Sequence, residues 1–385
     1  MKETILVFTA NVDKWGAERS IASMCSGLIS NKYNVLVIIP RNGPIVDILN
    51  DNGIEYMVHS FPMAIGTLFD TNISFLRAIA RTRHIVPDYI RMQWELFSLK
   101  KKLQKRRIVP IAVYSASLTI DFGVRFALLC NIKHIQHIRE NLDAFGYKLK
   151  YGYKNVIKKI SKASCLIICT CNAVKDRYAN DFKNNELCVV NNGVKNKQNL
   201  PIKEIIGKLN IIQTARLMKD KNILDSIKAV EIVISTGRTE IHLDIYGLGD
   251  QELLLKKYVE DHNLSSYITF KGFCDNIDYS KYNVGLMTSI YEAFSRSVLE
   301  YMNNGLVAIA SNTGGNIEQI QDGETGLLYS LNHPDTLACA ISKLYDDEDL
   351  INRLALAGRE YFIKHFTQEV YIKKITSLII SKING

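Results

Sequence analysis

Residues 284–315 constrain the fold of this chain most, because they read as two buried strands joined by a loop and one helix. The first apolar run extends from Val284 to Met287 and the second from Leu306 to Ala310. Between them, Ser295 is a favoured N-cap residue, and Gly305 stands where a helix C-cap is expected. This strand-loop-helix-strand order predicts an α/β architecture.

Two carboxylates, Glu292 and Glu300, lie eight residues apart across the junction of the loop and this helix. Both can face a ligand at the helix N-terminus, where free N–H groups and the helix dipole favour phosphate. Carboxylates in turn accept hydrogen bonds from sugar hydroxyls. The alternative is that both acids are solvated and only complement the dipole.

The stretch resembles the Glu-x7-Glu motif of retaining glycosyltransferases of family 4, which have the GT-B fold. The chain departs from that pattern at Tyr301, where the family usually has Ala, and at Leu306, where it usually has Pro. Both are tolerable packing changes. The matching positions are Glu292, Ala293, Phe294, Ser295, Glu300, Met302, Gly305, Val307, Ala310, Ser311, Gly314, Gly315 and Glu318.

The resemblance implies an α/β fold of the GT-B type, with two Rossmann-like domains facing each other across a deep cleft. A length of 385 residues also favours two domains. We expect residues 1–190 to form an acceptor-binding domain, onto which a C-terminal helix of about residues 366–385 crosses back. Residues 209–365 would form the nucleotide-sugar-binding domain, with residues 191–208 as the linker.

The N-terminal region begins with a strand, a loop around Gly16, a helix to about Ser30 and a second strand, the opening of a doubly wound domain. Its loop resembles the family's G-G-A-E-R sequence, with Trp15 in place of the first Gly, so Gly16 would let the backbone approach the ligand. A later strand ends near His137, which the resemblance places beside the donor sugar and phosphate. His134 is the second candidate, and a structural histidine is the alternative for His137.

In the C-terminal half, Arg216 and Lys221 follow a strand from Leu209 to Thr214 and can converge on one diphosphate. They resemble the family's G-R-L-x-x-x-K element, although a solvated loop is the alternative. Gly247 begins a G-x-G turn at a helix start, for which a tight turn is the alternative to phosphate contact. Gly272 and Phe273 match a strand end that lies near the nucleobase in the family.

The roles of the site residues are those that the resemblance implies. Arg216 and Lys221 stabilise the departing diphosphate without a metal, and Glu292 contacts hydroxyls of the transferred sugar. Glu300 accepts hydrogen bonds from the ribose. Backbone N–H groups of the remaining donor-binding residues assist at the helix N-terminus, namely Phe294, Ser295, Arg296 and Ser297.

Positive charge gathers in the N-terminal half of the chain. Residues 1–190 have a net charge of +12 and residues 191–385 a net charge of −3. Basic and aromatic residues interleave in residues 72–107 and 147–162. Because no nucleic-acid-binding motif accompanies them, we expect these segments to contact an anionic membrane surface rather than nucleic acid. Ordinary solvated helix faces are the alternative.

Several other classes of protein are disfavoured. No apolar run is long enough to span a membrane, no secretory signal is evident, and a cytoplasmic protein, peripheral on the inner face of the membrane, is expected. Cys165, Cys169 and Cys171 lie in an apolar strand, so we expect no metal there. The acidic run at Asp347 is discounted as a metal-binding motif, and no GxGxxG follows the first strand as in a dehydrogenase.

The sequence therefore predicts a retaining glycosyltransferase that needs no cofactor. It would move a sugar from a nucleotide-sugar donor, with UDP favoured over GDP, to a lipid-linked oligosaccharide in cell-surface polysaccharide synthesis. Two alternatives stay open: a GT-B sugar-nucleotide epimerase, and a noncatalytic, membrane-associated protein that binds sugar nucleotides.

Overall fold

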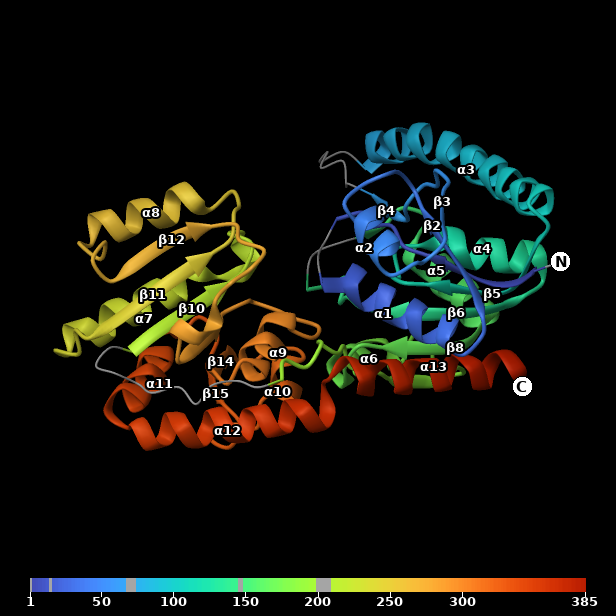
Figure 1. The fold of residues 1–385 in the computed structure, drawn as a ribbon. Helices are drawn as coiled ribbons and strands as arrows, with labels where there is room; N and C mark the ends of the chain where they lie inside the picture. Colours follow the sequence, from blue (N-terminus) through green and yellow to red (C-terminus); the bar gives the residue numbers. More distant parts are fainter. Residues whose placement is uncertain (1, 14–15, 67–73, 145–147, 199–208) are drawn as a thin grey trace. The chain divides into compact units, whose positions relative to one another are not determined.

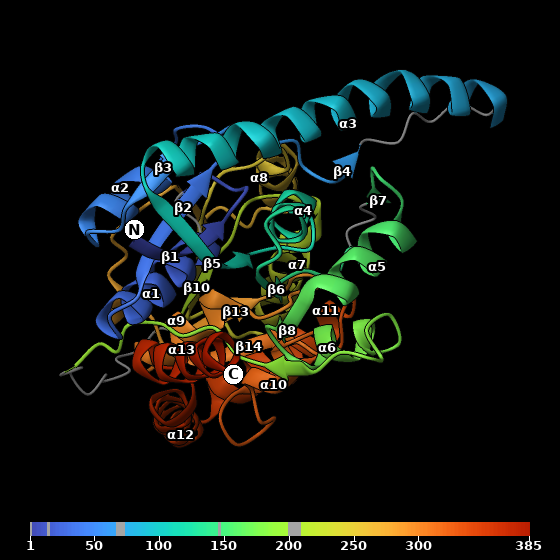
Figure 2. The same cartoon turned by 90° about the vertical axis from the view of Figure 1, so that its right-hand side faces the viewer.

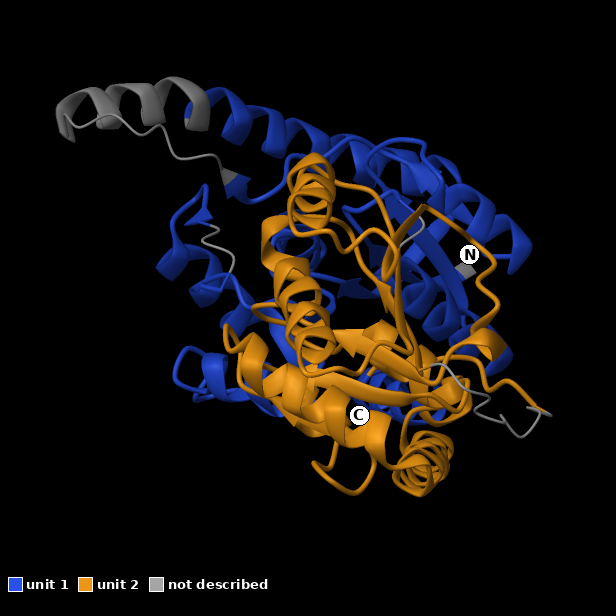
Figure 3. Cartoon of the chain, turned by 90° about the vertical axis from the view of Figure 1, so that its left-hand side faces the viewer, with its two compact units in different colours: residues 1–191, 371–385 blue, residues 192–370 orange. Residues whose placement is uncertain are grey.

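The computed structural model of the protein describes residues 2–13, 16–66, 74–144, 148–198 and 209–385, with the side chains of Lys2 and residues 66–85 excepted (Figure 1). The chain divides into two compact units (Figure 3). Unit 1 comprises Met1–Asn191 and Tyr371–Gly385, and unit 2 comprises Asn192–Val370. Trp15 and most of the predicted linker lie outside the described residues.

Unit 1 is built on a parallel sheet. In the described part of the chain it has seven strands, in the order β3-β2-β1-β5-β6-β8-β9. Strands β2 and β8 are nearly continuous apolar runs, as expected for parallel strands buried on both faces, whereas β6 also buries the polar residues His134, Gln136 and His137. The strand bounds are β1 Lys2–Phe8, β2 Asn34–Ile39, β3 Tyr56–Val58, β5 Ile108–Ser115, β6 Lys133–Ile138, β8 Ser164–Cys169 and β9 Leu187–Val189; β4 Ile65–Gly66 and β7 Lys148–Leu149 pair antiparallel apart from this sheet.

Helices cover both faces of the unit 1 sheet. Helices α3 and α4 lie on one face, and α1 and α13 lie on the other (Figure 1). Helix α3 is 32 residues long and runs along the outside of the unit (Figure 2). The helix bounds are α1 Gly16–Ser30, α2 Ile45–Asp51, α3 Ser74–Lys105, α4 Asp121–Cys130, α5 Tyr153–Ala163, α6 Asn172–Ala179 and α13 Gln368–Asn384.

The last helix of the chain belongs to unit 1, as the sequence predicts. Tyr371, Ile375 and Ile379 of α13 are buried in the same core cluster as the β1 strand. Helix α1 approaches α13 closely at Gly27, where an added Cβ would lie 2.5 Å from Cγ2 of Ile372. Lys133 of β6 also donates from Nζ to the backbone carbonyl of Ile383 at 2.9 Å.

Unit 2 has a second parallel sheet, with six strands among the described residues in the order β12-β11-β10-β13-β14-β15. The strands are β10 Leu209–Thr214, β11 Ile241–Tyr246, β12 Ile268–Gly272, β13 Val284–Met287, β14 Val307–Ser311 and β15 Leu327–Tyr329. The helices are η1 Lys219–Lys221, α7 Ile223–Ser235, α8 Glu252–Asp261, η2 Tyr279–Lys281, α9 Arg296–Asn303, α10 Asn316–Gln319, α11 Pro334–Asp346 and α12 Glu348–His365.

Both units are therefore Rossmann-like, and the predicted α/β class with two such domains is confirmed. The predicted apolar strand with clustered cysteines is β8, which includes Cys165 and Cys169. The strand ends before Cys171, which is instead the N-cap of α6. Cys169 and Cys171 are buried. Burial raises the pKa of the Cys169 thiol to about 12. These thiols behave as small apolar side chains of the core.

Candidate functional site

The sheet of unit 2 has its topological switch point between β10 and β13. Strands β11 and β12 lie in sequence order on one side of β10. Strands β14 and β15 lie in sequence order on the opposite side, beyond β13. Loops that follow the carboxyl ends of the two central strands meet there, and open α/β sheets bind ligands at this position. Arg216 and Lys221 follow β10, and Glu292 follows β13.

Lys221 and Glu292 meet at this edge of the sheet. The Lys221 ammonium forms an ion pair with Oε1 of Glu292, which also accepts a hydrogen bond from the Ser289 hydroxyl at 3.0 Å. The side chains of Lys221 and Glu292 are 13% and 20% exposed, so both are mostly covered by the protein. The structure thus brings together a cation and a carboxylate that are 71 residues apart in sequence.

Backbone contacts hold the two loops in register. Thr288 donates from its hydroxyl to the carbonyl oxygen of Lys221 at 2.9 Å and accepts from the Gln213 side-chain amide at 2.7 Å. The N–H of Ile290 donates to the carbonyl of Asp220 at 2.9 Å. Because these bonds fix both main chains, the ion pair occupies a preorganised position.

Arg216 lies in the same loop, but its guanidinium forms no ion pair among the described residues. Its side chain is exposed. The following residue anchors the loop, since the N–H of Leu217 donates to Leu248 O at 3.0 Å and its carbonyl accepts from Gln251 N at 2.9 Å. Because the main chain of this loop is fixed and the guanidinium is exposed, Arg216 can bind an anionic group of a ligand.

The G-x-G turn after β11 packs directly against this loop. Gly247 has φ +139°, and a Cβ there would lie 1.8 Å from Ala215 O. A Cβ on Gly249 would lie 2.2 Å from Leu217 O. Both glycines therefore allow the backbone of this turn to touch the Arg216 loop, which is a structural reason for their presence.

The N-terminus of α9 is built as the sequence predicts. Ser295 is the N-cap and accepts from Val298 N at 3.4 Å. Gln319 binds both the N–H and the carbonyl of Ser295, at 2.8 and 2.7 Å. Phe294 is 6% exposed and packs edge-on against Phe366, with ring centroids 5.4 Å apart. The Phe294 side chain thus anchors the loop from the interior.

Glu300 lies one turn into α9 and already has two partners. Arg296 donates from Nε to Oε1 of Glu300 at 3.0 Å, and the Tyr279 hydroxyl donates to Oε2 at 3.3 Å. Burial, together with the Glu300 charge, raises the pKa of Tyr279, which keeps this hydroxyl a donor. On the same helix, the Ser297 hydroxyl donates to Thr214 O at 3.0 Å and ties α9 to the end of β10.

Gly272 and Phe273 end the outermost strand of the unit 2 sheet. Gly272 has φ +69° and accepts from Gly247 N at 2.9 Å, so the ends of β11 and β12 are joined. Phe273 is 57% exposed. The exposed Phe273 ring thus lies just after the end of β12, at the carboxyl edge of the sheet.

The two predicted site residues of unit 1 lie on different elements. Gly16 is the first residue of α1, and His137 lies on β6. The His137 ring is fully buried, and its Nδ1 contacts the Tyr114 hydroxyl, while Nε2 is buried without a hydrogen-bond partner among the described residues. Burial and the nearby Arg139 hold the pKa of His137 well below its usual range, so the ring is neutral.

His134, the second candidate histidine, has both ring nitrogens occupied. They bind the hydroxyls of Ser115 at 2.9 Å and Ser164 at 2.7 Å. Burial lowers the pKa of His134 to about 3. The ring links β5, β6 and β8 inside the unit, which is a structural role.

A buried polar cluster beside His137 is the feature that the sequence interpretation missed. Arg139 lies close to the hydroxyls of Tyr114 and Tyr371, and these tyrosines help to raise its pKa against the opposing effect of burial. Glu18 of α1 is 1% exposed, and burial raises its pKa to about 7. Glu18 lies in the stretch that resembles the G-G-A-E-R sequence, and Arg139 directly follows β6, but only the fold brings these residues together with Tyr371 of α13.

The raised pKa of Glu18 predicts a pH-dependent stability. A carboxyl with a pKa of about 7 in the folded state and an ordinary value of 4.5 stabilises the fold below pH 4.5, and this contribution is lost as the pH rises through 7. Its charged neighbours are Arg139 and Asp13. Between pH 4.5 and 8, the wild type should therefore lose about 3 kcal/mol of unfolding free energy relative to Glu18→Gln.

Urea unfolding of the wild type and Glu18→Gln at both pH values measures this difference. Glu55→Gln is the matched control, because Glu55 is an exposed carboxylate of the same unit. The control should track the wild type at both pH values. Equal pH profiles for the wild type and Glu18→Gln would show that the Glu18 carboxyl has an ordinary pKa in the folded state.

The acidic run at Asp347 has a capping role in the structure. Asp347 is the N-cap of α12 and accepts from Leu350 N at 2.9 Å. No group of three or more His, Cys, Asp or Glu among the described residues is arranged to hold a metal ion. Within the same part of the chain, no helix is both long and apolar enough to cross a membrane.

Comparison with known proteins agrees with this architecture. Residues 196–361 match the family described as Glycosyl transferases group 1. The chain is 24% identical over 381 residues to the UDP-Gal:alpha-D-GlcNAc-diphosphoundecaprenol alpha-1,3-galactosyltransferase of Escherichia coli, covering 92% of this chain and 91% of that protein.

Two further matches extend the comparison. The GtfA subunit of a UDP-N-acetylglucosamine–peptide N-acetylglucosaminyltransferase of Streptococcus pneumoniae is 25% identical over 350 residues, covering 86% of this chain, which spans 65% of that protein. The Anabaena protein HepE, crystallised with UDP, superposes with a TM-score of 0.75 at 14% identity, covering 98% of this chain and 100% of HepE. The fold is therefore GT-B, and the resemblance to GT-B glycosyltransferases is supported.

Proposed function

We propose that this protein is a retaining, metal-independent glycosyltransferase of family 4 that uses a UDP-sugar donor. The observation that carries the proposal is the placement of Lys221, Glu292 and the open cation Arg216 at the switch point of unit 2. A cationic pair beside carboxylates matches a ligand that has both a diphosphate and sugar hydroxyls. HepE, whose fold this chain shares, was crystallised with UDP, which supports UDP as the nucleotide.

In the proposed reaction, the bond between the anomeric carbon and the diphosphate breaks while the acceptor oxygen bonds to the same carbon. Arg216 and Lys221 stabilise the negative charge that develops on the leaving diphosphate. The acceptor proton passes to the departing phosphate oxygen, so no enzymic nucleophile is required. Lys221 is already paired with Glu292, and it can turn toward the diphosphate while Glu292 accepts from the sugar.

The remaining donor contacts are proposed from the resemblance to family 4. Glu300 can accept from the ribose hydroxyls when these replace its contacts with Arg296 or Tyr279. Gly272 and Phe273 are assigned to the nucleobase edge. In unit 1, Gly16 is assigned to close backbone approach, and the neutral His137 supplies Nε2 as a partner for a hydroxyl or phosphate.

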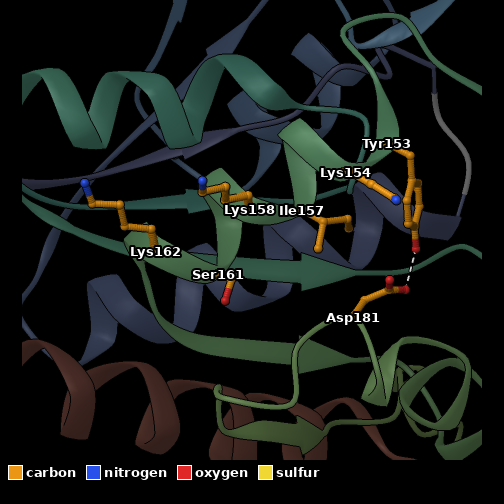
Figure 4. A pocket seen from close by; sticks show the side chains of 7 residues that line it. All are labelled: Tyr153, Lys154, Ile157, Lys158, Ser161, Lys162 and Asp181. Carbon is orange, nitrogen blue, oxygen red and sulfur yellow. Dashed lines mark hydrogen bonds between the residues drawn. The ribbon is translucent and has the colours of Figure 1, made fainter.

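The acceptor is proposed to be a lipid-linked oligosaccharide used in surface polysaccharide synthesis, held by unit 1. The E. coli relative acts on a diphosphoundecaprenol-linked sugar, which supports this class. Unit 1 has the basic helix α5, whose exposed residues Lys154, Lys158 and Lys162 line a hollow of about 490 Å³ together with Tyr153 (Figure 4). A cytoplasmic protein held peripherally at the inner face of the membrane fits these features.

The test is nucleotide release from a panel of UDP- and GDP-sugars, with and without a lipid extract. Release from one UDP-sugar that increases with lipid is expected for the wild type. Glu300→Ala should raise the KM for that donor by about tenfold or more, because the ribose loses a charged acceptor. Glu324→Ala, which alters an exposed carboxylate of the same unit outside the motif and the proposed roles, is the control.

Three outcomes contradict parts of the proposal. Turnover of the donor without any acceptor to another sugar nucleotide would identify an epimerase. Binding without turnover would identify a noncatalytic sugar-nucleotide-binding protein. Release that lipid does not affect would exclude the lipid-linked acceptor but leave glycosyl transfer to another acceptor intact.

A further inference from the structure

Helix α3 is held against unit 1 by a buried apolar face. Met92, Leu96, Leu99 and Leu103 are 0 to 3% exposed and belong to the core cluster of the unit. Their spacing of three or four residues places them on one side of a helix. This apolar face packs α3 against the core of the unit.

A second apolar stripe follows the opposite side of the same helix. Val86, Ile90, Trp94 and Phe97 are 48%, 63%, 66% and 53% exposed. With about 100° of rotation per residue, they fall within an arc of about 80°, facing away from the buried residues. We call these four residues the α3 stripe. Helix α3 lies along the outside of unit 1 (Figure 2), and the exposed fractions of these four side chains show that they are not covered within the described part of the chain.

The acids of α3 are turned away from the α3 stripe. Asp88 pairs with Lys150 at 2.5 Å, and Glu95 is 8% exposed and lies 3.3 Å from His59 Nε2. Burial lowers the pKa of His59 to about 4, so this contact is to a neutral ring. Within the described side chains of α3, both carboxylates thus bind other parts of unit 1.

Basic residues flank the α3 stripe on the solvent side. Arg91, Lys101 and Lys105 are exposed. With about 100° of rotation per residue, Lys101 and Lys105 lie beside the α3 stripe at the C-terminal end of α3. The outer side of the helix therefore combines large apolar side chains, an aromatic pair and positive charge. This is the composition of helices that lie in the plane of an anionic lipid surface.

The charge argues for lipid rather than for a second copy of the chain. The α3 sequence has eight Lys and Arg against two acids, so a copy docked there would bring like charges together. An anionic bilayer offers the opposite charge together with an apolar interior. Scattered single apolar residues need no explanation, but four in one continuous stripe do.

We infer that the α3 stripe inserts into the headgroup and upper acyl region of an anionic bilayer, with the axis of α3 parallel to the surface. The inference deepens the proposed function, on which it rests for the presence of a membrane-bound acceptor. Positive charge alone gives adsorption without a defined orientation, whereas a rigidly packed helix with an inserted stripe fixes which side of unit 1 faces the lipid.

The test is co-sedimentation with vesicles of equal parts phosphatidylglycerol and phosphatidylcholine, at low and high salt. Ile90→Gln/Trp94→Gln/Phe97→Gln should weaken binding by about tenfold or more, because the buried apolar area is lost. The wild type should retain measurable binding at high salt, and the triple variant should not. The matched control is Leu253→Gln/Leu254→Gln, which alters residues 82% and 63% exposed on α8 of unit 2 and should bind as the wild type does.

The depth of insertion has its own readout. The chain has two tryptophans, so in a Trp15→Phe background the fluorescence reports Trp94 alone. Vesicles with acyl chains brominated near the headgroup should quench this emission. Emission that stays at the wavelength of the lipid-free protein, without quenching, would overturn the inference.

Two other results would also overturn it. Equal vesicle binding by the triple variant and the wild type would assign adsorption to charge alone. A wild type that is dimeric without lipid, and a triple variant that is monomeric, would make the α3 stripe an interface between copies. Nucleotide release without lipid should be the same in the wild type and the triple variant, so a failure of catalysis is recognised separately.

Discussion

Replacing Lys221 by Ala is expected to lower kcat for sugar transfer by about a thousandfold, or about 4 kcal/mol of transition-state stabilisation. The ammonium lies at the switch point of unit 2, is 13% exposed, and is held beside Glu292 by loops bonded to each other. A preorganised cation of this kind acts mainly on charge that develops in the transition state. The KM for the donor should change less than kcat.

Steady-state nucleotide release measures this effect, with Lys219→Ala as the matched control. Lys219 belongs to the same short helix, η1, and its side chain is exposed. The control should retain activity within about twofold, because an exposed charge pointing to solvent contributes little. A Lys221→Ala variant with unchanged kcat would remove Lys221 from the reaction. An equal loss of kcat in Lys219→Ala would show that activity depends on the net charge of the loop and not on Lys221 in particular.

Gly247→Ala is expected to destabilise unit 2 by about 4 kcal/mol. The cost combines a backbone conformation that alanine rarely adopts with a contact too close to relieve without moving main chain. The added Cβ would lie 1.8 Å from Ala215 O and 2.9 Å from Ala215 C. Because Arg216 follows directly, a shifted loop should also weaken donor binding in any variant that still folds.

Gly237→Ala provides the control for backbone strain alone. Gly237 has φ +88°, and an added Cβ there meets no described atom within 4 Å. This variant should lose only about 1–2 kcal/mol and keep its donor affinity. Thermal unfolding gives the stability of both variants, and titration with UDP gives the affinity. If both variants lost the same stability, strain would be the whole effect and the contact with Ala215 would be unimportant.

The sequence predicted most of unit 2, since each motif there follows a strand whose apolar run is short and clearly bounded. The predicted strands from Leu209 to Thr214 and from Val284 to Met287 agree with β10 and β13. The predicted cap Ser295 begins α9, and Gly305 follows it with φ +66°. Helix caps depend on residues that are close in sequence, so they can be predicted without knowledge of the tertiary contacts.

Other features depend on contacts between residues far apart in sequence, which local sequence patterns do not predict. The pairing of Lys221 with Glu292 follows from the order of the strands in the sheet. The cluster of Glu18, Arg139 and Tyr371 joins three elements that are far apart in sequence. The charge of residues 72–107 was evident in the sequence, but the α3 stripe emerged only once the buried side of that helix was known.

The return of helix α13 to unit 1 determines when that unit can be completed during synthesis. Its core includes Tyr371, Ile375 and Ile379, which the ribosome adds only after all of unit 2. Unit 2, Asn192–Val370, is continuous in sequence and can fold as it emerges. Until α13 is synthesised, the core of unit 1 is incomplete on the side of the sheet covered by α1. Deletion of the last fifteen residues is therefore expected to destabilise unit 1 rather than unit 2.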